Sequence, residues 1–247
     1  MPPISMFRHR QRPSGMEFAS CQACNNDTSP ADLVASFIAR ISPVATHKEW
    51  QTIEACEKKG KLEQIAPGFL SEFFQDSQSE HGLIRINGLL RRTVKIVADG
   101  PLTRAYLLVF SAKIAMAIYR ERIGSALPLH GGVEVMTYLN AGLAQSQADK
   151  FLSIMPASAT LQQGSVQVGE QFFYRYNDDG HSIVAALVRF HQGLYVTFVA
   201  TSNPSFYGFP LQGAHSTFVR PGEIMHLMPP KQMNRRLGGI RKMCISL

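Results

Sequence analysis

The hydrophobic residues of this 247-residue sequence change their spacing along the chain, and this change limits the folds open to it. Over Leu33–Ile41 they recur every three or four residues, which is the spacing of one face of a helix. In the last third of the chain they alternate with polar residues, as in strands that bury one face. Helices early in the chain and antiparallel strands late in it predict an α+β protein.

Capping and turn residues place the individual elements. A helix is expected to begin near Thr28–Ser29, because Pro30 suits the first helical turn and Asp32 its positive end. Further helices are expected over Thr46–Lys59, Pro67–Gln75, Leu102–Ile123 and Gln145–Ile154, with stops at Gly60 and Gly124. Strands are expected over Arg92–Val97, Gly132–Leu139, Gln171–Tyr176, Ser182–His191 and Leu194–Thr201, with a two-residue turn at Gln192-Gly193. The polar stretch Ser77–Gly82 is expected to be a boundary.

The composition is that of a folded chain with a basic excess. Hydrophobic residues make up 45% and charged residues 17%, and the formal net charge is +7. Basic residues gather near both ends, for example at Arg8, Arg10 and Arg12, and no acid follows Glu223. Two interpretations remain open, solvated tails or a surface that contacts nucleic acid.

Four cysteines exclude a scaffold built on disulfides and favour a reducing, cytoplasmic location. The basic N-terminus lacks the apolar segment of a secretory signal. The longest apolar run, Ala105–Ile118, is interrupted by Ser111 and Lys113, so no membrane association is expected.

The pair Cys21-Gln-Ala-Cys24 is the sharpest local motif. Two thiolates at this spacing can share one Zn²⁺ if a tight knuckle directs both sulfurs inward. A redox dithiol needs a strand before the pair and a helix that opens directly on it, and two buried thiols are a third interpretation. A third and fourth zinc ligand would have to come from isolated residues, and the candidates are His9, His47, Cys56 and Cys244. Cys56 is expected in the core of a helix rather than at a metal.

Three N-terminal stretches resemble the latter part of an HNH endonuclease-like domain of the bacterial Cys-x-x-Cys type: Pro2–Phe7, Arg12–Gly15 and Cys21–Ser29. In that family a first Cys-x-x-Cys precedes an acidic-His-x-Pro-Pro run, and a second one followed by Asn leads into a helix. The resemblance implies a ββα-metal unit. Its two cysteine pairs would hold a structural zinc, and its His with helix-borne groups would handle a catalytic divalent ion such as Mg²⁺.

The chain departs from the family pattern at its start. Aligning Pro2-Pro3 with the family's run puts the metal-activating His before Met1, and the first cysteine pair further upstream. We therefore expect a start codon misassigned to an internal methionine, or a natural remnant. In both cases Cys21 and Cys24 form an incomplete zinc site. By resemblance Asn25 is the remaining catalytic-site residue, but an amide cannot replace an imidazole as a base.

These observations predict three regions. They are a partial HNH-like ββα-metal region over residues 1–42, a helical connector over 43–80, and an α+β domain over 81–247. The leading hypothesis is metal-dependent hydrolysis of DNA phosphodiesters in the full-length family form, impaired in this chain. The alternative is a non-catalytic nucleic-acid-binding or interaction protein. DNA is the expected partner, with Arg8, Arg10 and Arg12 as the contact residues.

The other charged groups singled out in the sequence are expected to have structural roles and not functional ones. Asp32 is expected to be a charge at a helix start, and Lys113 to reach solvent along its own aliphatic stem. The run Asp178–His181 is expected to be a turn between strands.

Overall fold

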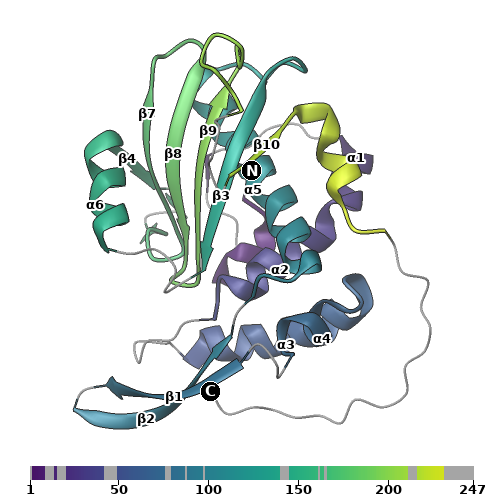
Figure 1. Cartoon of the computed structure of the whole chain (residues 1–247), viewed down its shortest axis with the longest axis vertical. Coiled ribbons are helices and arrows are strands. Elements are labelled where there is room, and N and C mark those ends of the chain that lie inside the picture. The colour runs from purple at the N-terminus through teal and green to yellow at the C-terminus, as the bar shows by residue number, and fades with distance from the viewer. Residues whose placement is uncertain are drawn as a thin grey trace.

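The computed structural model describes residues 2–8, 14–15, 21–41, 49–75, 79–86, 88–96, 98–139, 145–160, 162–163, 166–210 and 216–230 (Figure 1). The helices of this part are η1 (Ile4–Met6), α1 (Gln22–Asp27), α2 (Ser29–Ile38), α3 (Glu49–Ile65), α4 (Phe69–Phe73), α5 (Pro101–Ile123), α6 (Gln145–Ile154) and η5 (Pro221–Leu227). The strands are β1 (Ser79–Ile86), β2 (Leu89–Ile96), β3 (Gly132–Leu139), β4 (Ala157–Thr160), β5 (Gln162–Gln163), β6 (Val166–Gln167), β7 (Phe172–Asp178), β8 (Ile183–Phe190), β9 (Leu194–Thr201) and β10 (Thr217–Val219).

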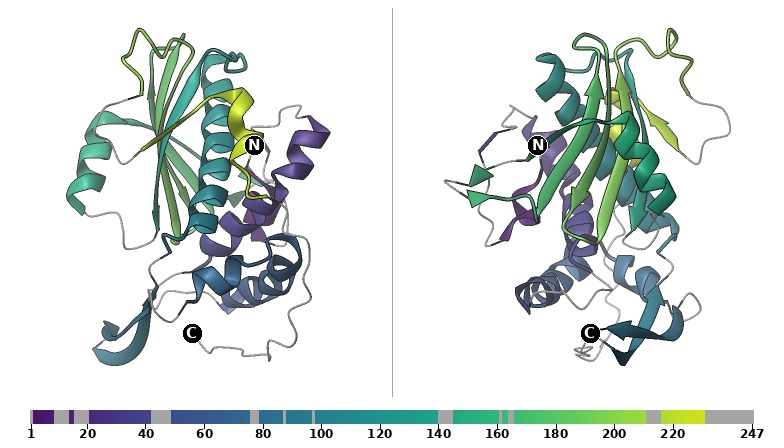
Figure 2. Two further views of the ribbon diagram at one scale, coloured as in Figure 1. Left: turned by 45° about the vertical axis from the view of Figure 1, so that its right-hand side comes forward. Right: turned by 90° about the vertical axis from the view of Figure 1, so that its left-hand side faces the viewer.

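A six-stranded antiparallel sheet and the long helix α5 form the centre of the protein. The strand order is β10-β3-β9-β8-β7-β4, so β7, β8 and β9 form a meander with β3 added beside β9. Helix α5 lies along one face of the sheet and α6 beside the opposite face (Figures 1 and 2). Phe151 of α6 contacts Tyr138 of β3 edge to face, with ring centroids 6.3 Å apart. The α+β class expected from the spacing of apolar residues is confirmed.

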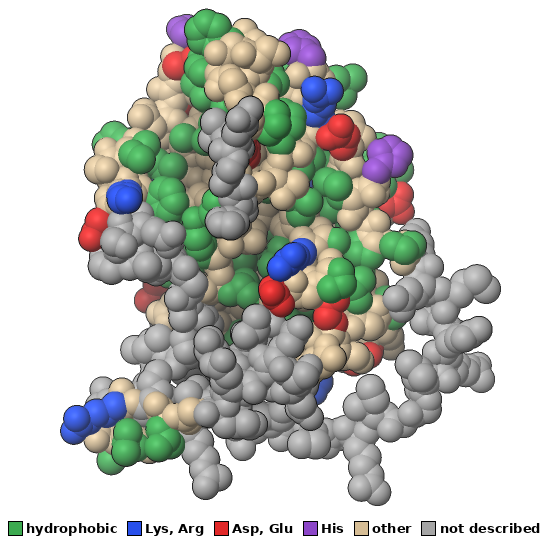
Figure 3. All heavy atoms as spheres, in the orientation of Figure 1, with side chains coloured by type: hydrophobic (Ala, Val, Ile, Leu, Met, Phe, Trp, Pro, Cys, Tyr) green, Lys and Arg blue, Asp and Glu red, His purple; other side chains and the backbone are tan. Residues whose placement is uncertain are grey.

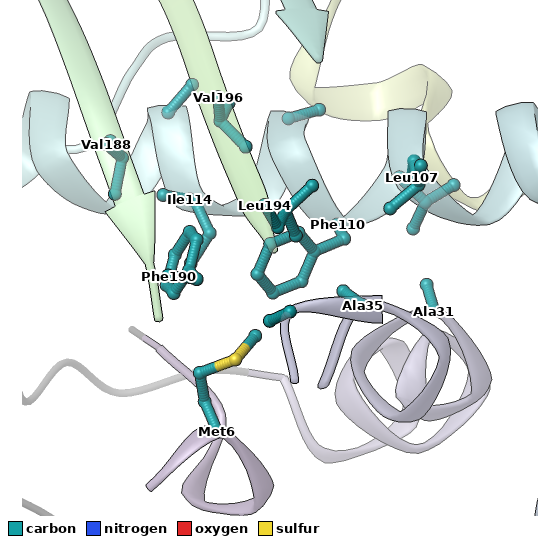
Figure 4. Packing of buried hydrophobic residues seen from close by; sticks show 14 of the residues in the cluster. Met6, Ala31, Ala35, Leu107, Phe110, Ile114, Val188, Phe190, Leu194 and Val196 are labelled. Atoms are coloured by element: carbon teal, nitrogen blue, oxygen red, sulfur yellow. The ribbon is translucent and has the colours of Figure 1, made fainter. Parts of the chain in front are cut away.

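The hydrophobic core fills the space between the sheet, α5 and α2 (Figure 4). Alternate residues of β8 and β9 point toward α5, and Val188, Phe190 and Val196 are completely buried there. Met6 from η1 and Ala31 from α2 belong to the same cluster. Residues of the region predicted over 1–42 and of the domain predicted over 81–247 therefore share one core. The boundaries between the three predicted regions stay a prediction.

Helix α5 has the length and apolar composition of a membrane-spanning helix, which the interrupted run Ala105–Ile118 did not indicate. However, 67% of that stretch is buried inside the protein, as is usual for the central helix of a globular fold. Its N-terminus is capped by a residue from another helix. The Glu72 carboxylate on α4 accepts bonds from the backbone N–H groups of Leu102 and Thr103, at 2.9 and 2.8 Å. Gly124 ends α5 in the left-handed conformation, as expected.

Most of the observed helices and strands match the expected ones, and the differences have local causes. Helix α3 continues through Gly60 to Ile65, because an exposed glycine lowers helix stability by only about 1 kcal/mol. The β8–β9 connection is not a two-residue turn: Phe190 pairs with Leu194, so three residues form it, and His191 has a φ of 51°. Part of the expected boundary Ser77–Gly82 is instead the start of β1.

Gly193 in this turn packs directly against the end of α2. A Cβ at this position would lie 2.4 Å from the carbonyl oxygen of Ile38 and 2.6 Å from that of Ala39. Since backbone oxygens cannot move away cheaply, Gly193→Ala is expected to destabilise the protein by about 1–3 kcal/mol. Gly60→Ala, at a helical site with no atom within 4 Å, is expected to stabilise it by about 0.5–1 kcal/mol. Urea unfolding measures both, and equal effects of the two substitutions would contradict this packing.

A buried arginine attaches the N-terminal residues to the helices. The Arg40 guanidinium, whose side chain is fully buried, forms an ion pair of 2.7 Å with Glu54 of α3. It also donates to the carbonyl oxygens of Ser36 and Met6, at 2.8 and 3.1 Å. Nε2 of His191 lies 2.7 Å from the same Met6 oxygen, so η1, α2, α3 and the β8–β9 turn meet at one point.

His191 gives this cluster a defined dependence on pH. Burial, together with the positive charge of Arg40, lowers the pKa of His191 to about 3, although the bond to the Met6 carbonyl oxygen opposes the shift. Between pH 6.5 and 3 the unfolded chain therefore binds the proton that the folded protein does not, so acid destabilises the fold. On account of His191 alone, the free energy of unfolding is expected to fall as the pH drops below 6.5, with a slope that approaches about 1.4 kcal/mol per pH unit near pH 5.

The substitution His191→Asn isolates this contribution, because asparagine tolerates a positive φ. Urea unfolding at pH 6.5 and pH 5 should give the native protein a loss about 1.6 kcal/mol larger than that of the variant. The same loss in both proteins would show that His191 does not titrate in this way.

Candidate functional site

The cysteine pair lies at the start of a helix and not in a knuckle. Cys21 is the residue before α1, and the backbone N–H of Asn25 donates to its carbonyl oxygen at 2.9 Å. Residues 21–25 therefore close a helical turn, which places Cys21 and Cys24 on one side of it. Both thiols are exposed, and the shared zinc ion expected between them stays a prediction. Helix α1 is an additional short helix, and α2 begins at Ser29 after Thr28, which confirms the helix start expected there.

The two thiols interact with each other and differ in acidity. The backbone N–H of Cys24, followed by its thiol and the N–H of Ala23, lowers the pKa of Cys21. The hydrogen bond with Cys21, and then its negative charge, raises the pKa of Cys24. Cys21 is thus the first of the pair to become a thiolate, which is the form that binds metals and attacks disulfides.

Asn25 and Arg8 are both exposed, but the structure attaches them differently. Asn25 lies in α1 and has a helical backbone. The backbone N–H of Arg8 donates to the side-chain oxygen of Gln171, which directly precedes β7, at 2.6 Å. Arg10 and Arg12 lie outside the described residues.

Cys21 and Cys24 offer two thiols, whereas a tetrahedral zinc site needs four ligands. Two thiolates at an i, i+3 spacing on a helical turn fit two of the four ligand positions. Among the residues that the structure describes, no group of three or more His, Cys, Asp or Glu side chains is arranged to hold a metal ion. Cys56 is exposed on α3 rather than in the core as expected, because the buried face of that helix passes through Ala55 and Leu62. His9, His47 and Cys244 lie outside the described residues.

Two other charged clusters have structural roles. Both oxygens of Asp32 lie 2.8 Å from Lys113 Nζ, so the pair joins α2 to α5 and Lys113 does not reach solvent alone. Burial raises the pKa of Asp32, and Lys113 only partly offsets this. Asp179 accepts from the backbone N–H groups of His181, Ser182 and Ile183, at 2.9, 2.7 and 3.0 Å. These bonds lower its pKa despite the opposing effect of burial, and they confirm the turn expected at Asp178–His181.

A hollow of about 430 Å³ lies beside the junction of α1 and α2. Asp27, Gln64 and Tyr106 are its polar lining residues. The rest of its lining is apolar: Pro30, Ile65, Pro67, Leu102, Met225, Met228, Pro229 and Pro230. Burial, followed by the negative charge of Glu72, raises the pKa of Tyr106. This lining offers apolar contact and few hydrogen bonds, and it contains no histidine or cysteine to act as a base or nucleophile.

No family model, curated protein or solved structure matches this chain.

Proposed function

We propose that this protein is an HNH endonuclease-like protein and that the part described here binds DNA. The observation that carries the proposal is the exposed thiol pair at the start of α1, with Asn25 in the same helical turn. The order Cys-x-x-Cys-Asn at the entry to a helix is the one on which the family resemblance rests. The net charge of +7 supports an anionic partner.

Zinc would be structural in this account. A zinc ion held by four ligands supplies folding free energy, and the first turn of α1 would provide two of those ligands through Cys21 and Cys24. No step of phosphodiester cleavage is assigned to the described residues, because they do not bring a base and a metal-binding group together. Asn25 would serve only to orient a neighbouring group.

Zinc content tests the thiol pair. The purified protein is expected to hold zinc weakly and at less than one equivalent per chain, because two thiolates leave two positions open. Cys21→Ser or Cys24→Ser should abolish this binding. Cys56→Ser, which removes another exposed thiol on a helix, should leave it unchanged. Elemental analysis after gel filtration measures the content, and one tightly bound zinc per chain would contradict an incomplete site.

DNA binding and cleavage are tested together. A mobility-shift assay with a 30-base-pair duplex in low salt should show binding with no added metal. Plasmid DNA incubated with Mg²⁺ or Mn²⁺ should remain supercoiled. Nicking by the native protein that is lost in Cys24→Ser would instead favour the nuclease form of the hypothesis. Absence of any shift would contradict the proposed function.

A second candidate function is thiol–disulfide exchange, because α1 begins directly after Cys21, which meets one of the two requirements of a redox pair. The two thiols would lose two electrons and two protons to a small disulfide such as oxidised glutathione, which would leave as two thiols. Mass spectrometry of Cys56→Ser treated with oxidised glutathione should then detect the loss of two hydrogens per chain. Stable mixed disulfides, or no reaction, would exclude this function.

A further inference from the structure

Strands β1 and β2 form a separate ribbon that projects from the helical end of the protein (Figures 1 and 2). Their antiparallel register is unbroken from Ser79–Ile96 to Ile86–Leu89. Two residues, Asn87-Gly88 in the sequence, connect the strands, and Gly88 has a φ of 83°. Asn-Gly is the residue pair that favours a tight turn matching the twist of two strands.

This ribbon buries none of its described side chains. Leu83, Leu89 and Leu90 near the turn are 65%, 64% and 68% exposed, and Arg85 is also exposed. None of these residues belongs to the hydrophobic core. Figure 3 shows basic and hydrophobic side chains together at this end of the molecule. A two-stranded hairpin is marginally stable alone, so its exposed apolar residues point to a partner.

The charge of the ribbon identifies the class of that partner. Its sequence contains the four basic residues Arg85, Arg91, Arg92 and Lys95 and the single acid Glu80. The register places two arginines and two leucines on one face: Leu83, Arg85, Leu90 and Arg92. A face that combines positive charge with apolar contact suits a polyanion that also presents apolar groups. In duplex DNA the phosphates and the thymine methyl groups meet this description.

The dimensions of the ribbon select one groove of the duplex. Two strands about 4.8 Å apart with their side chains are too wide for a minor groove of about 6 Å. A major groove of about 12 Å admits a two-stranded ribbon. Eight residues per strand span about 27 Å, so basic residues along the ribbon can reach phosphates on both sides of the groove.

We propose that the β1–β2 ribbon is the arm by which this protein enters the major groove of duplex DNA. The basic residues contact phosphates, and the leucines near the turn contact base edges. This inference rests on the proposed function, since it names the surface through which DNA is bound.

Neutralising the arm tests the inference. The triple variant Arg85→Gln, Arg91→Gln, Arg92→Gln should bind a fluorescein-labelled 30-base-pair duplex at least about tenfold more weakly at fixed salt. A matched triple, Lys61→Gln, Arg104→Gln, Lys150→Gln, removes the same charge from exposed sites elsewhere and should change the affinity less than about twofold. The melting temperatures of both variants should remain close to that of the native protein.

The outcomes separate the two proposals. If the native protein binds the duplex and the two triple variants weaken binding equally, the ribbon is not the arm that enters DNA. The proposal that the protein binds DNA then stands. If the native protein does not bind the duplex at all, both proposals fail. If Leu89→Ser with Leu90→Ser converts a dimer to a monomer and the arginine triple binds DNA normally, the ribbon contacts a second copy of the chain and the inference is wrong.

Discussion

Arg40→Met is expected to lower the free energy of unfolding by about 3–5 kcal/mol, the usual effect of removing one member of a buried ion pair. The reason is that Glu54, only 15% exposed, loses the guanidinium that neutralises it. The carbonyl oxygens of Ser36 and Met6 lose a donor in the same step. Urea unfolding measures the loss.

Two further variants show whether the cause is the unpaired charge. Adding Glu54→Leu to Arg40→Met should recover part of the lost stability, because an apolar replacement of both partners leaves no buried charge. Arg104→Met breaks a 3.4 Å pair with Asp99 in which the arginine is 71% exposed, and it should cost less than about 1 kcal/mol. If Arg40→Met lowers the free energy of unfolding no more than Arg104→Met does, the stabilising role of the buried Arg40–Glu54 pair is contradicted.

Phe110→Ala is expected to destabilise the protein by about 3–5 kcal/mol through the cavity that it leaves. Phe110 is fully buried on α5, and its ring contacts that of Phe190 with centroids 5.1 Å apart. In a chain of this size the loss corresponds to a melting temperature lower by about 6–20 °C. Calorimetry or circular dichroism can follow it.

Phe206→Ala is the matched control, since Phe206 is 76% exposed. It should change the free energy of unfolding by no more than about 0.5 kcal/mol. Similar losses for the two phenylalanines would mean that α5 does not pack on the sheet as described.

The sheet and its central helix could be predicted because local signals determine them. The expected ranges of β3 and α6 coincide with the observed ones, and α5 ends at Gly124 as its capping residue indicates. Each of these elements has an apolar pattern of sufficient length and a turn or cap at its end. Strand β10 and the short strand β4 were not predicted, because three or four residues carry too little pattern.

The polar contacts could not be predicted, because they join distant parts of the chain. Asp32 and Lys113 are 81 positions apart, and His191 and Met6 are 185 apart. Nothing in the sequence near Lys113 indicates a carboxylate partner, so its aliphatic stem was expected to carry the charge to solvent. The capping of α5 by Glu72 could not be predicted for the same reason.

The β1–β2 ribbon, in contrast, has a clear signal in the sequence. Asn87-Gly88 with apolar residues on both sides is the strongest short-range hairpin pattern. The polar residues of Ser77–Gly82, in contrast, favour a boundary, and β1 begins within them. The start of α1 was not predicted, because Cys21 lacks the hydroxyl, carboxylate or amide side chain of a usual N-cap residue.

The salt dependence of DNA affinity tests the central claim most directly. Fluorescence anisotropy with the 30-base-pair duplex, repeated between 50 and 200 mM salt, gives the slope of log affinity against log salt concentration. The account predicts a negative slope for the native protein, and a slope smaller by about 3 when Arg85, Arg91 and Arg92 are neutralised. No measurable binding at the lowest salt concentration, or an affinity that does not change with salt, would contradict it.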